Sequence, residues 1–428
     1  MAGVSSSNGF SFSRRGFLGG VLAAGASAAG LSAGEPGKPA SGDSARQGLA
    51  PSGQSPVPAK ELPRKIKLGL IGCGGRGPWL GEFFRKHGGY ELYAVADYFA
   101  DRAQGAGEKF GVPVSRRFAG LRAHERLLAS GVEAVVVVNV PRFHPEHIQA
   151  AVETGCHVFA AKPVAIDVPG ALKVLAAGKA ATQKKRCVLV DYQMPTDPII
   201  REVVQRVHEG GLGRLAHLDS LGISPPWAEP AVASLEERLR SRWLSLIALS
   251  GDVITENSIH IINALLWLVG KRPVRAIGRA KVCRPHPRDD FREVYLVTYE
   301  FDDGVLWTHR CQSLNNQLEW ALRLEAFGEQ ATAVLSYRGR SYLRGGPKHY
   351  GGGTVDSLYD QGAMRNIATF YDNILEGRCD NPSVAQAADD VLVAVLGREA
   401  AARRCELSMD ELLRENRALE LDTSGLRV

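Results

Sequence analysis

Glu256 and His260 are four residues apart in the segment SGDVITENSIHIINALLWLVG, whose apolar residues have the spacing of an amphipathic helix. Side chains four apart project from the same face of a helix. A carboxylate beside an imidazole can orient its tautomer and raise its basicity, so the pair could exchange a proton with a substrate hydroxyl. The spacing alone also fits an exposed ion pair or a buried structural histidine.

Lys162 directly follows the apolar segment HVFAA and precedes Pro163. At the carboxyl end of a parallel strand, its amine could point into a cofactor crevice, where it would hydrogen-bond a ribose or polarise a substrate oxygen. A surface lysine ahead of a turn-forming proline is the alternative that this spacing leaves open.

Gly72, Gly74 and Gly77 follow the apolar run KIKLGLI and precede PWLGEFFRKHG, which can begin a helix. Glycines allow a sharp turn and a close approach to a pyrophosphate, and amides at a helix start favour an anion. A second apolar run ends in Asp97, where an acid can accept both ribose hydroxyls. This order predicts a dinucleotide site, with Arg76 in the loop as a further cofactor contact. Asp97 favours NAD over NADP, because an acid repels a 2′-phosphate.

The elements that must position these groups fall into two patterns. Over residues 64–191, apolar strands alternate with helices, and runs such as AVVVVNV are typical of a parallel sheet covered on both faces. We therefore expect an α/β Rossmann domain with a doubly wound parallel sheet.

Residues 192–428 have a different sequence pattern, in which several long predicted strands follow one another between 274 and 337. Strands without helices between them predict an α+β domain with a large, open, mostly antiparallel sheet for substrate binding and oligomerisation. Asp302-Asp303-Gly304 is expected to join two strands as a hairpin. A late helix over 383–403 is expected to pack back on the Rossmann domain.

The N-terminal segment has the features of a twin-arginine export signal. Arg14 and Arg15 precede a short stretch of small and apolar residues with Ala-x-Ala-type cleavage sites, which predicts a signal peptide over 1–33. Residues 34–63, rich in Pro, Gly, Ser and Ala, are expected to be a flexible linker. The apolar stretch is too short for a stable membrane anchor. The predictions are the twin-arginine export machinery as a partner and a periplasmic or secreted location.

That export route carries folded proteins, so a cofactor can be inserted beforehand. Outside the inner membrane there is no free pool of NAD. An exported NAD protein is therefore expected to retain its cofactor and to restore its redox state within its own cycle.

Composition excludes some classes of function. The formal net charge is +6 over 428 residues, and Lys and Arg are spread along the chain, so no nucleic-acid partner is expected. The seven cysteines are widely spaced, without zinc-site spacing or a dense disulfide framework. Buried thiols for most of them, and no bound metal, are the expectation.

The order of these pieces resembles the Gfo/Idh/MocA oxidoreductase family from Lys65 to about Arg403. The stretch PRFHPEHIQAAVETGCHVFAAKPVAID looks like the family's third-strand region followed by its Glu-Lys-Pro motif. SGDVITENSIH is similar to the family's Gly-Gly-x-x-x-Asp-x-x-x-His helix. With the export signal ahead of them, these motifs resemble a secreted subgroup of sugar-active members.

The resemblance implies NAD in the first domain and a sugar or sugar derivative over the open sheet of the second. Lys162 would bind the cofactor ribose and the reacting hydroxyl, and His260 would be the general base or acid. Asn139, Pro141 and His144 match positions that line the nicotinamide ribose. A homo-oligomer is also implied, since large open sheets in this family commonly pair.

The sequence departs from the family pattern at several positions. Ala161 stands where a Glu usually precedes Lys-Pro, Glu256 where Asp is usual, and Asn263 where an acid is common. The strand end VDYQMPTDP has Gln193 and Met194 in a region that frequently contains an arginine. These changes put simple alcohol dehydrogenation in doubt.

Aromatic and polar side chains of the second domain are candidates for sugar contacts, although structural packing is an alternative role for each aromatic. Trp267 is expected to belong to a helix core instead. The candidates are Tyr192, Trp243, Asn263 and Arg365, with Trp227 and Trp320 as further stacking surfaces.

The sequence thus favours an exported NAD-dependent oxidoreductase that acts on a sugar by hydride transfer. The close rival is a redox-neutral glycosidase, in which oxidation, elimination and reduction by the same cofactor leave no net redox change. A non-catalytic sugar-binding homologue, suggested by Ala161, is the third possibility.

Overall fold

The computed structural model describes residues 62–230 and 234–427. The predicted signal peptide, and the predicted linker up to residue 61, lie outside the described residues. No helix within those two described ranges has both the length and the apolar composition needed to cross a membrane.

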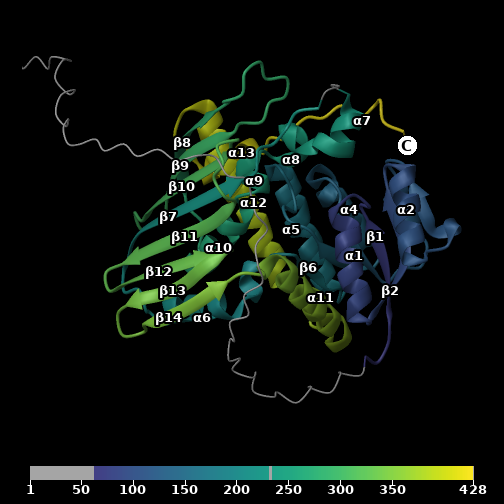
Figure 1. Ribbon diagram of the computed structural model, residues 1–428, viewed down its shortest axis with the longest axis horizontal. Coiled ribbons are helices and arrows are strands. Elements are labelled where there is room, and N and C mark those ends of the chain that lie inside the picture. The colour runs from purple at the N-terminus through teal and green to yellow at the C-terminus, as the bar shows by residue number, and fades with distance from the viewer. Residues whose placement is uncertain (1–61, 231–233, 428) are drawn as a thin grey trace, which may run out of the picture. The chain divides into compact units, whose positions relative to one another are not determined.

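A six-stranded parallel sheet forms the first half of the described chain, in the order β3-β2-β1-β4-β5-β6 (Figure 1). The predicted doubly wound domain is confirmed, and the four residues of β4 are all buried because helices cover both faces. The edge strand β3 has only three half-buried residues, too short for an apolar pattern to predict. The strands are β1 (Ile66–Ile71), β2 (Tyr90–Asp97), β3 (Arg117–Ala119), β4 (Ala134–Val137), β5 (His157–Ala160) and β6 (Val188–Val190).

Five helices connect these strands. Each ends where its apolar pattern stops, and α1 and α2 end at glycines in the left-handed conformation. They are α1 (Arg76–His87), α2 (Ala100–Phe110), α3 (Ala123–Leu128), α4 (His144–Glu153) and α5 (Val168–Gln183).

The second sheet has nine strands in the order β14-β13-β12-β11-β7-β10-β9-β8-β15. Its neighbours are antiparallel apart from β7 and β10, so the sheet is mixed and mostly antiparallel, as predicted. The hairpin at Asp302-Asp303-Gly304 joins β9 to β10, with Gly304 at φ +83°. The strands are β7 (Leu215–Ser224), β8 (Arg275–Lys281), β9 (Val294–Glu300), β10 (Leu306–Ser313), β11 (Ala321–Gly328), β12 (Ala331–Ser336), β13 (Gly339–Gly345), β14 (Tyr350–Val355) and β15 (Leu407–Ser408).

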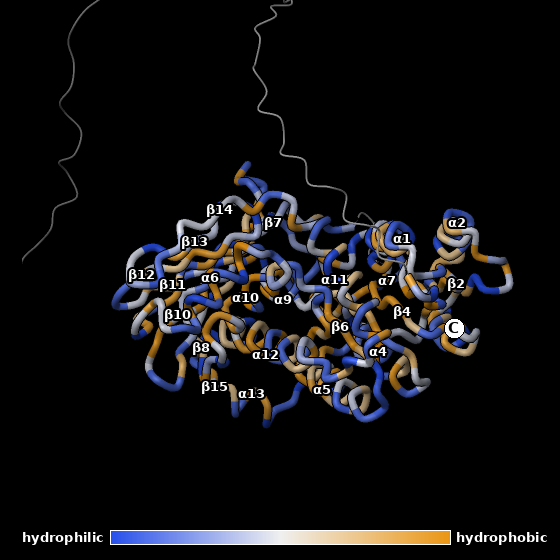
Figure 2. Tube along the Cα trace, turned by 90° about the horizontal axis from the view of Figure 1, so that it is seen from below, coloured by the Kyte–Doolittle hydropathy of each residue, from blue (hydrophilic) through white to orange (hydrophobic). Residues whose placement is uncertain are grey.

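Helices α6 (Pro198–His208), α10 (Ile259–Val269) and α12 (Pro382–Arg403) pack against one face of this sheet. Figure 2 shows α6 and α10 between the sheet and the Rossmann strands. Shorter helices lead into and out of this layer: α7 (Leu235–Glu237), α8 (Ile247–Ser250), α9 (Val253–Glu256) and α13 (Met409–Glu415).

Helix α11 (Leu358–Glu376) returns to the first sheet and packs on α1. Its Phe370 and Tyr371 belong to the same buried cluster as Phe84 and Phe159. Helix α12 contacts both α5 and β8, so it lies against both halves. The C-terminal part of the chain therefore fastens the two sheets to each other.

The predicted single helix over residues 250–270 is two helices, α9 and α10, with Asn257 and Ser258 between them. This break changes which side chains meet in the site.

Candidate functional site

Two of the three glycines are required by the turn itself. A Cβ on Gly72, at φ +104°, would lie 2.6 Å from the backbone nitrogen of Asn139, and one on Gly77 would lie 1.9 Å from the Gly72 carbonyl oxygen. The nearest atom to a Cβ on Gly74 is 3.5 Å away, on Arg102, so packing alone does not require glycine there. Gly74 faces the cavity, and its missing side chain leaves room for a ligand beside the N-terminus of α1.

Asp97 ends β2 at the rim of this turn. Its carboxylate accepts hydrogen bonds from the backbone nitrogens of Cys73 (2.7 Å) and Phe99 (2.9 Å), which fix its orientation. Burial raises the pKa of Asp97, and the two amide donors oppose that rise. The remaining lone pairs face the cavity, where ribose hydroxyls can donate to them. Arg102 also lines this end, a contact that the sequence did not predict.

A segment of the second half of the chain covers the Asp97 end of the cavity. Leu239 and Arg240 line the cavity together with Phe99. The Arg240 guanidinium lies 4.1 Å from the centre of the Phe99 ring and forms an ion pair of 2.9 Å with Asp101. We call residues 235–243 the first cover segment.

Residues 419–427 form a second cover segment on the same side. The backbone nitrogen of Arg427 donates to the Tyr98 hydroxyl at 3.2 Å, and its carbonyl accepts from Leu121 at 3.0 Å. Both the Tyr98 hydroxyl and the Arg427 guanidinium bind Glu236 of the first cover segment. The two cover segments are therefore linked to each other over the rim.

Lys162, Glu256 and His260 line the same cavity, but Glu256 pairs with the lysine. The amine of Lys162 lies 2.9 Å from Oε1 of Glu256 and 2.8 Å from its backbone carbonyl oxygen. Nδ1 of His260 is buried without a hydrogen-bond partner. The predicted orientation of the imidazole by Glu256 is therefore wrong. The helix breaks after Glu256, so the two side chains do not follow one continuous helix face.

His260 has a pKa well below its usual value, because of burial first and then the positive charges of Lys162 and Arg76. Its imidazole is thus neutral at physiological pH and can accept a proton. The rings of Tyr337 and Tyr192 pack edge-on against it, with centroids 5.4 Å and 6.2 Å away.

Ala161 is buried at the cavity wall, where the family pattern has a glutamate. The lysine beside it nevertheless has a carboxylate partner, because Glu256 reaches it from α9. Glu256 thus supplies from a distant segment the negative charge that position 161 lacks.

Arg76 lines the cavity, and its guanidinium donates to the hydroxyl of Tyr359 in the second half of the chain at 2.7 Å. It donates to Asp191 at 2.6 Å, and Asn366 and Gln193 donate to the same carboxylate at 2.9 Å and 3.0 Å. The Gln193 carbonyl oxygen accepts from the hydroxyl of Tyr337 at 3.2 Å. Arg76 therefore supplies the arginine that the strand end VDYQ lacks.

The sequence reading missed Asp191, Asn366 and Tyr337. Asp191 could have been found, because it follows the apolar run RCVLV at the carboxyl end of a parallel strand, as Lys162 follows HVFAA. Asn366 and Tyr337 are brought in by α11 and by the end of β12, and no local pattern marks them.

Asn139, Pro141 and His144 all line the cavity. The two ring nitrogens of His144 each lie 2.8 Å from a backbone carbonyl oxygen, those of Pro163 and Asn139. Burial lowers the pKa of His144 to about 4. The ring thus holds the Asn139 loop against the segment that carries Lys162, which is a positioning role.

The predicted sugar contacts divide into two groups. Trp243 and Trp320 line the cavity, whereas Trp227 packs against Phe291 elsewhere. Trp267 is partly buried and packs against the core, as expected.

Tyr192, Asn263 and Arg365 are not among the residues that line the cavity, so the structure does not support direct substrate contacts for them. Asn263 is buried behind His260 and donates to Asp390 at 2.8 Å; burial raises the pKa of Asp390 to about 7. Arg365 instead binds Gln361 on its own helix. Tyr192 is buried against the His260 ring.

One cavity of about 680 Å³ therefore extends from the glycine turn and Asp97 to Lys162 and His260. The glycine cradle, the oriented carboxylate and the helix N-terminus fit a dinucleotide at one end. The other end combines a neutral imidazole, an ammonium group and two indole rings, which suits a polyhydroxylated substrate.

Comparison with protein families agrees with this division. Residues 66–192 match a model described as an oxidoreductase family with an NAD-binding Rossmann fold. Residues 200–334 match the GFO/IDH/MocA C-terminal domain.

Several dehydrogenases are similar in sequence. A myo-inositol dehydrogenase of Streptomyces leeuwenhoekii is 29% identical over 62% of this chain and 75% of its own length. An inositol 2-dehydrogenase of Saccharopolyspora erythraea is 25% identical over 76% of this chain and 86% of its own.

Solved structures share the fold. A levoglucosan dehydrogenase in complex with NADH and levoglucosan has a TM-score of 0.66 at 17% identity, covering 81% of this chain and 100% of its own. An aldose-aldose oxidoreductase from Caulobacter crescentus, with glycerol bound, has a TM-score of 0.64 at 18% identity over the same shares.

Proposed function

The chain belongs to the Gfo/Idh/MocA family of NAD-binding oxidoreductases, and from this premise we propose that it oxidises a hydroxyl group of a sugar or cyclic polyol with a retained NAD. The observation that carries the proposal is the single cavity that joins the glycine turn and Asp97 to Lys162, Glu256 and His260. Bound NAD supplies a hydride acceptor there.

His260 removes the proton of the reacting hydroxyl. Its imidazole is neutral because burial and two nearby cations disfavour a second proton. It is therefore in the unprotonated form that a general base needs, although a pKa below the working pH also makes it a weaker base.

Lys162 stabilises the oxygen from which the proton leaves. Its ammonium group can donate to an alkoxide or a carbonyl oxygen, and an ammonium charge stabilises the negative charge that develops there. Glu256 holds the amine at 2.9 Å and so fixes its position on the cavity wall. Arg76, tied to Asp191, is the second positive charge that faces His260.

A ring-shaped, polyhydroxylated substrate is supported by two features. Trp243 and Trp320 present indole rings at the cavity wall, and such rings can pack against the apolar face of a sugar. The similar proteins include dehydrogenases of inositol and of levoglucosan. The specific substrate is to be identified by screening cyclic polyols and aldoses.

The test is nucleotide analysis followed by turnover. We expect NAD to co-purify with the full chain and to be reduced when an inositol or aldose panel is added, with an absorbance rise from NADH. If the protein neither contained nor bound NAD, or if no polyol reduced it, the proposal would fail.

The retained cofactor and the exported location form one further part of the proposal. The two cover segments lie over the Asp97 end of the cavity and are linked through Glu236 and Arg427, which supports slow release of a nucleotide. Arg14 and Arg15 support export through the twin-arginine machinery and a periplasmic or secreted subgroup.

Replacing Arg240 with Ala should speed release of NAD several-fold in dialysis, because the contacts to Asp101 and Phe99 are lost. Arg323→Ala on the far sheet is the matched control. A reporter fused after residue 63 tests export: replacing Arg14 and Arg15 with Lys should keep the reporter in the cytoplasm.

A retained NAD also favours the redox-neutral glycosidase as the second candidate. In that reaction the ring is oxidised, the neighbouring glycosidic bond is eliminated with release of the alcohol, water adds to the resulting double bond, and the ring carbonyl is reduced again, so that there is no net redox change. Aryl glycosides without added NAD distinguish the two. Many turnovers per enzyme support the glycosidase, whereas an absence of turnover until a second carbonyl substrate is added supports the oxidoreductase.

A homo-oligomer is proposed from the uncovered face of the second sheet. Ile277, Leu296 and Leu306 are 46%, 53% and 48% exposed on β8, β9 and β10, on strands whose alternate residues are buried. Apolar side chains at this exposure favour contact with a second copy. Light scattering should show a dimer or larger assembly that Leu296→Glu weakens; a monomeric native chain would contradict this.

A further inference from the structure

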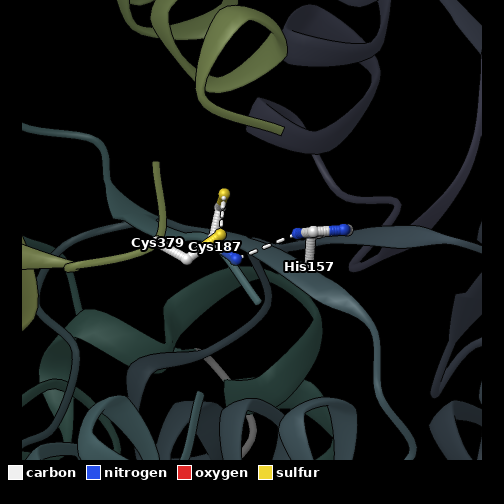
Figure 3. A group of neighbouring side chains, drawn as sticks. All are labelled: His157, Cys187 and Cys379. Atoms are coloured by element: carbon white, nitrogen blue, oxygen red, sulfur yellow. Dashed lines mark hydrogen bonds between the residues drawn. The ribbon is translucent and has the colours of Figure 1, made fainter. Parts of the chain in front are cut away.

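Cys187 and Cys379 bring their sulfur atoms to 2.8 Å from each other, although they are 192 residues apart in sequence. Cys187 directly precedes β6, and Cys379 lies in the link between α11 and α12. Both side chains are buried. Figure 3 shows that the two thiols meet from two different segments of the chain.

The backbone around the two cysteines is fixed by contacts that do not involve either sulfur. Asn381 accepts from the Val188 nitrogen at 2.7 Å and donates to the Arg186 carbonyl oxygen at 2.9 Å. These bonds hold the α11–α12 link in register with the start of β6. The two sulfur atoms therefore remain neighbours whatever their redox state.

We propose that Cys187 and Cys379 form a disulfide bond that locks the α11–α12 link onto the Rossmann sheet when the protein is in an oxidising compartment. For its setting in the cell this rests on the proposed export. Each thiol loses one proton and one electron as the S–S bond forms. The oxidant is a disulfide, of a thiol oxidase or of a small molecule such as oxidised glutathione, and it is cleaved to two thiols.

A bound metal ion is the alternative role for this cluster, because a ring nitrogen of His157 lies within 4.8 Å of both sulfur atoms. However, Nδ1 of His157 accepts a hydrogen bond from the backbone nitrogen of Cys187 at 2.9 Å, as Figure 3 shows. The group offers three ligand atoms within the described residues, whereas a closed structural zinc site has four. The nearby charges do not favour a metal ion over the disulfide, because Arg186 and Asp380 act on Cys187 with opposite signs.

The bond would join the start of β6 to the link between α11 and α12, which lies 192 residues further along the chain. Helices α11 and α12 contribute to the packing of both sheets, so a covalent tie between them and β6 restricts the unfolded chain strongly. Reduction should therefore lower the thermal midpoint of the whole described unit rather than loosen one loop.

The experiment is differential alkylation of the purified full chain after equilibration in buffers of oxidised and reduced glutathione. We expect Cys187 and Cys379 to become protected together, as a cross-linked pair of peptides in mass spectrometry. Cys156 is the matched control, since its buried thiol donates to the Val132 carbonyl oxygen. The variant C156S should keep the cross-link, and C187S and C379S should each lose it.

Reduction should lower the thermal midpoint of the native protein by roughly 5–10 °C and leave that of C187S unchanged. Full alkylation of both cysteines in oxidant-treated, unfolded protein would overturn the proposal without requiring any variant to fold. So would stoichiometric binding of added Zn²⁺ that blocks the oxidation. NAD content and polyol turnover, measured on the same samples, test the proposed function separately.

Discussion

The glycine turn and Asp97 lie within one short stretch, residues 72–97, whereas the reacting groups at the other end of the cavity arrive on three separate elements. The turn closes because Gly72 and Gly77 permit contacts that a Cβ would block, and Asp97 is oriented by the nitrogen of Cys73 within the same turn. Lys162 and His260, by contrast, share the site only because α9 brings Glu256 against Lys162 and α10, which carries His260, follows directly.

Cofactor binding and the chemical step should therefore respond to substitutions in different parts of the cavity. Changes within the glycine turn should alter nucleotide affinity first. Changes to Lys162, Glu256 or His260 should alter turnover while leaving the nucleotide bound.

Replacing His260 with Ala should lower kcat/KM by about 10²–10⁴-fold, because the variant lacks the base that accepts the hydroxyl proton. The NAD content of the purified protein should be unchanged. His208→Ala on the exposed side of α6 is the control and should turn over normally. A loss below tenfold in the His260 variant would remove this residue from the proton transfer.

Glu256→Gln should lower kcat by roughly 10–100-fold, because the amine of Lys162 loses its charged partner. A double-mutant cycle identifies the partner. In a Lys162→Met background the Glu256 change should have little further effect, whereas with His260→Ala the two losses should multiply. The opposite result would be additive effects of the Glu256 and Lys162 changes and coupled effects of the Glu256 and His260 changes. It would mean that Glu256 pairs with His260, as the sequence predicted.

Local patterns predicted most of the fold, and at the glycine-turn end of the site they predicted the glycines and Asp97 but not Arg102 or the two cover segments. The apolar runs place β1, β2 and β7–β12 close to their observed bounds, because one or both faces of these strands are buried. Strands β13 and β14 were missed, since GRSYLRG and YGGGTV are rich in Gly and Arg and do not alternate cleanly.

At the other end of the cavity, the sequence predicted which residues take part but not which of them pair with each other. Lys162, Glu256 and His260 do share one cavity, but the choice of partner for Glu256 depends on a helix break at Asn257 and Ser258, residue types that favour a helix start although Ser258 forms no side-chain capping bond. Asp191 and Asn366 meet Arg76 across long stretches of sequence. Contacts of this kind depend on how the layers of helices and strands pack in three dimensions. The spacing of residues along the chain carries no information about that packing.

Asp97→Ala should weaken NAD binding by about tenfold, or about 1.4 kcal/mol, because the ribose hydroxyls lose a charged acceptor. NADP binding should weaken less or improve, since the repulsion of a 2′-phosphate is removed. Calorimetry on protein stripped of nucleotide measures both. Cys73→Ala, which keeps the backbone nitrogen that binds Asp97, should retain the native affinity.

The smallest expected effect is a shift in the pH profile. Because the pKa of His260 lies well below its usual value of 6.5, kcat/KM should stay level as the pH falls through 6.5 and decline only well below it. Positive charge near the ring disfavours the imidazolium form. Arg76→Gln removes one such charge, so it should raise the pKa of His260 and move the acid decline upward by less than about one pH unit.

Arg85→Gln, which removes a surface arginine paired with Glu82 on the same helix, should leave the profile unchanged. A downward shift in the Arg76 variant, or no shift, would mean that the charge of Arg76 does not lower the pKa of His260. An upward shift would instead place Arg76, a residue of the glycine turn, within electrostatic reach of the base. The two ends of the cavity would then be built separately but coupled through one charge.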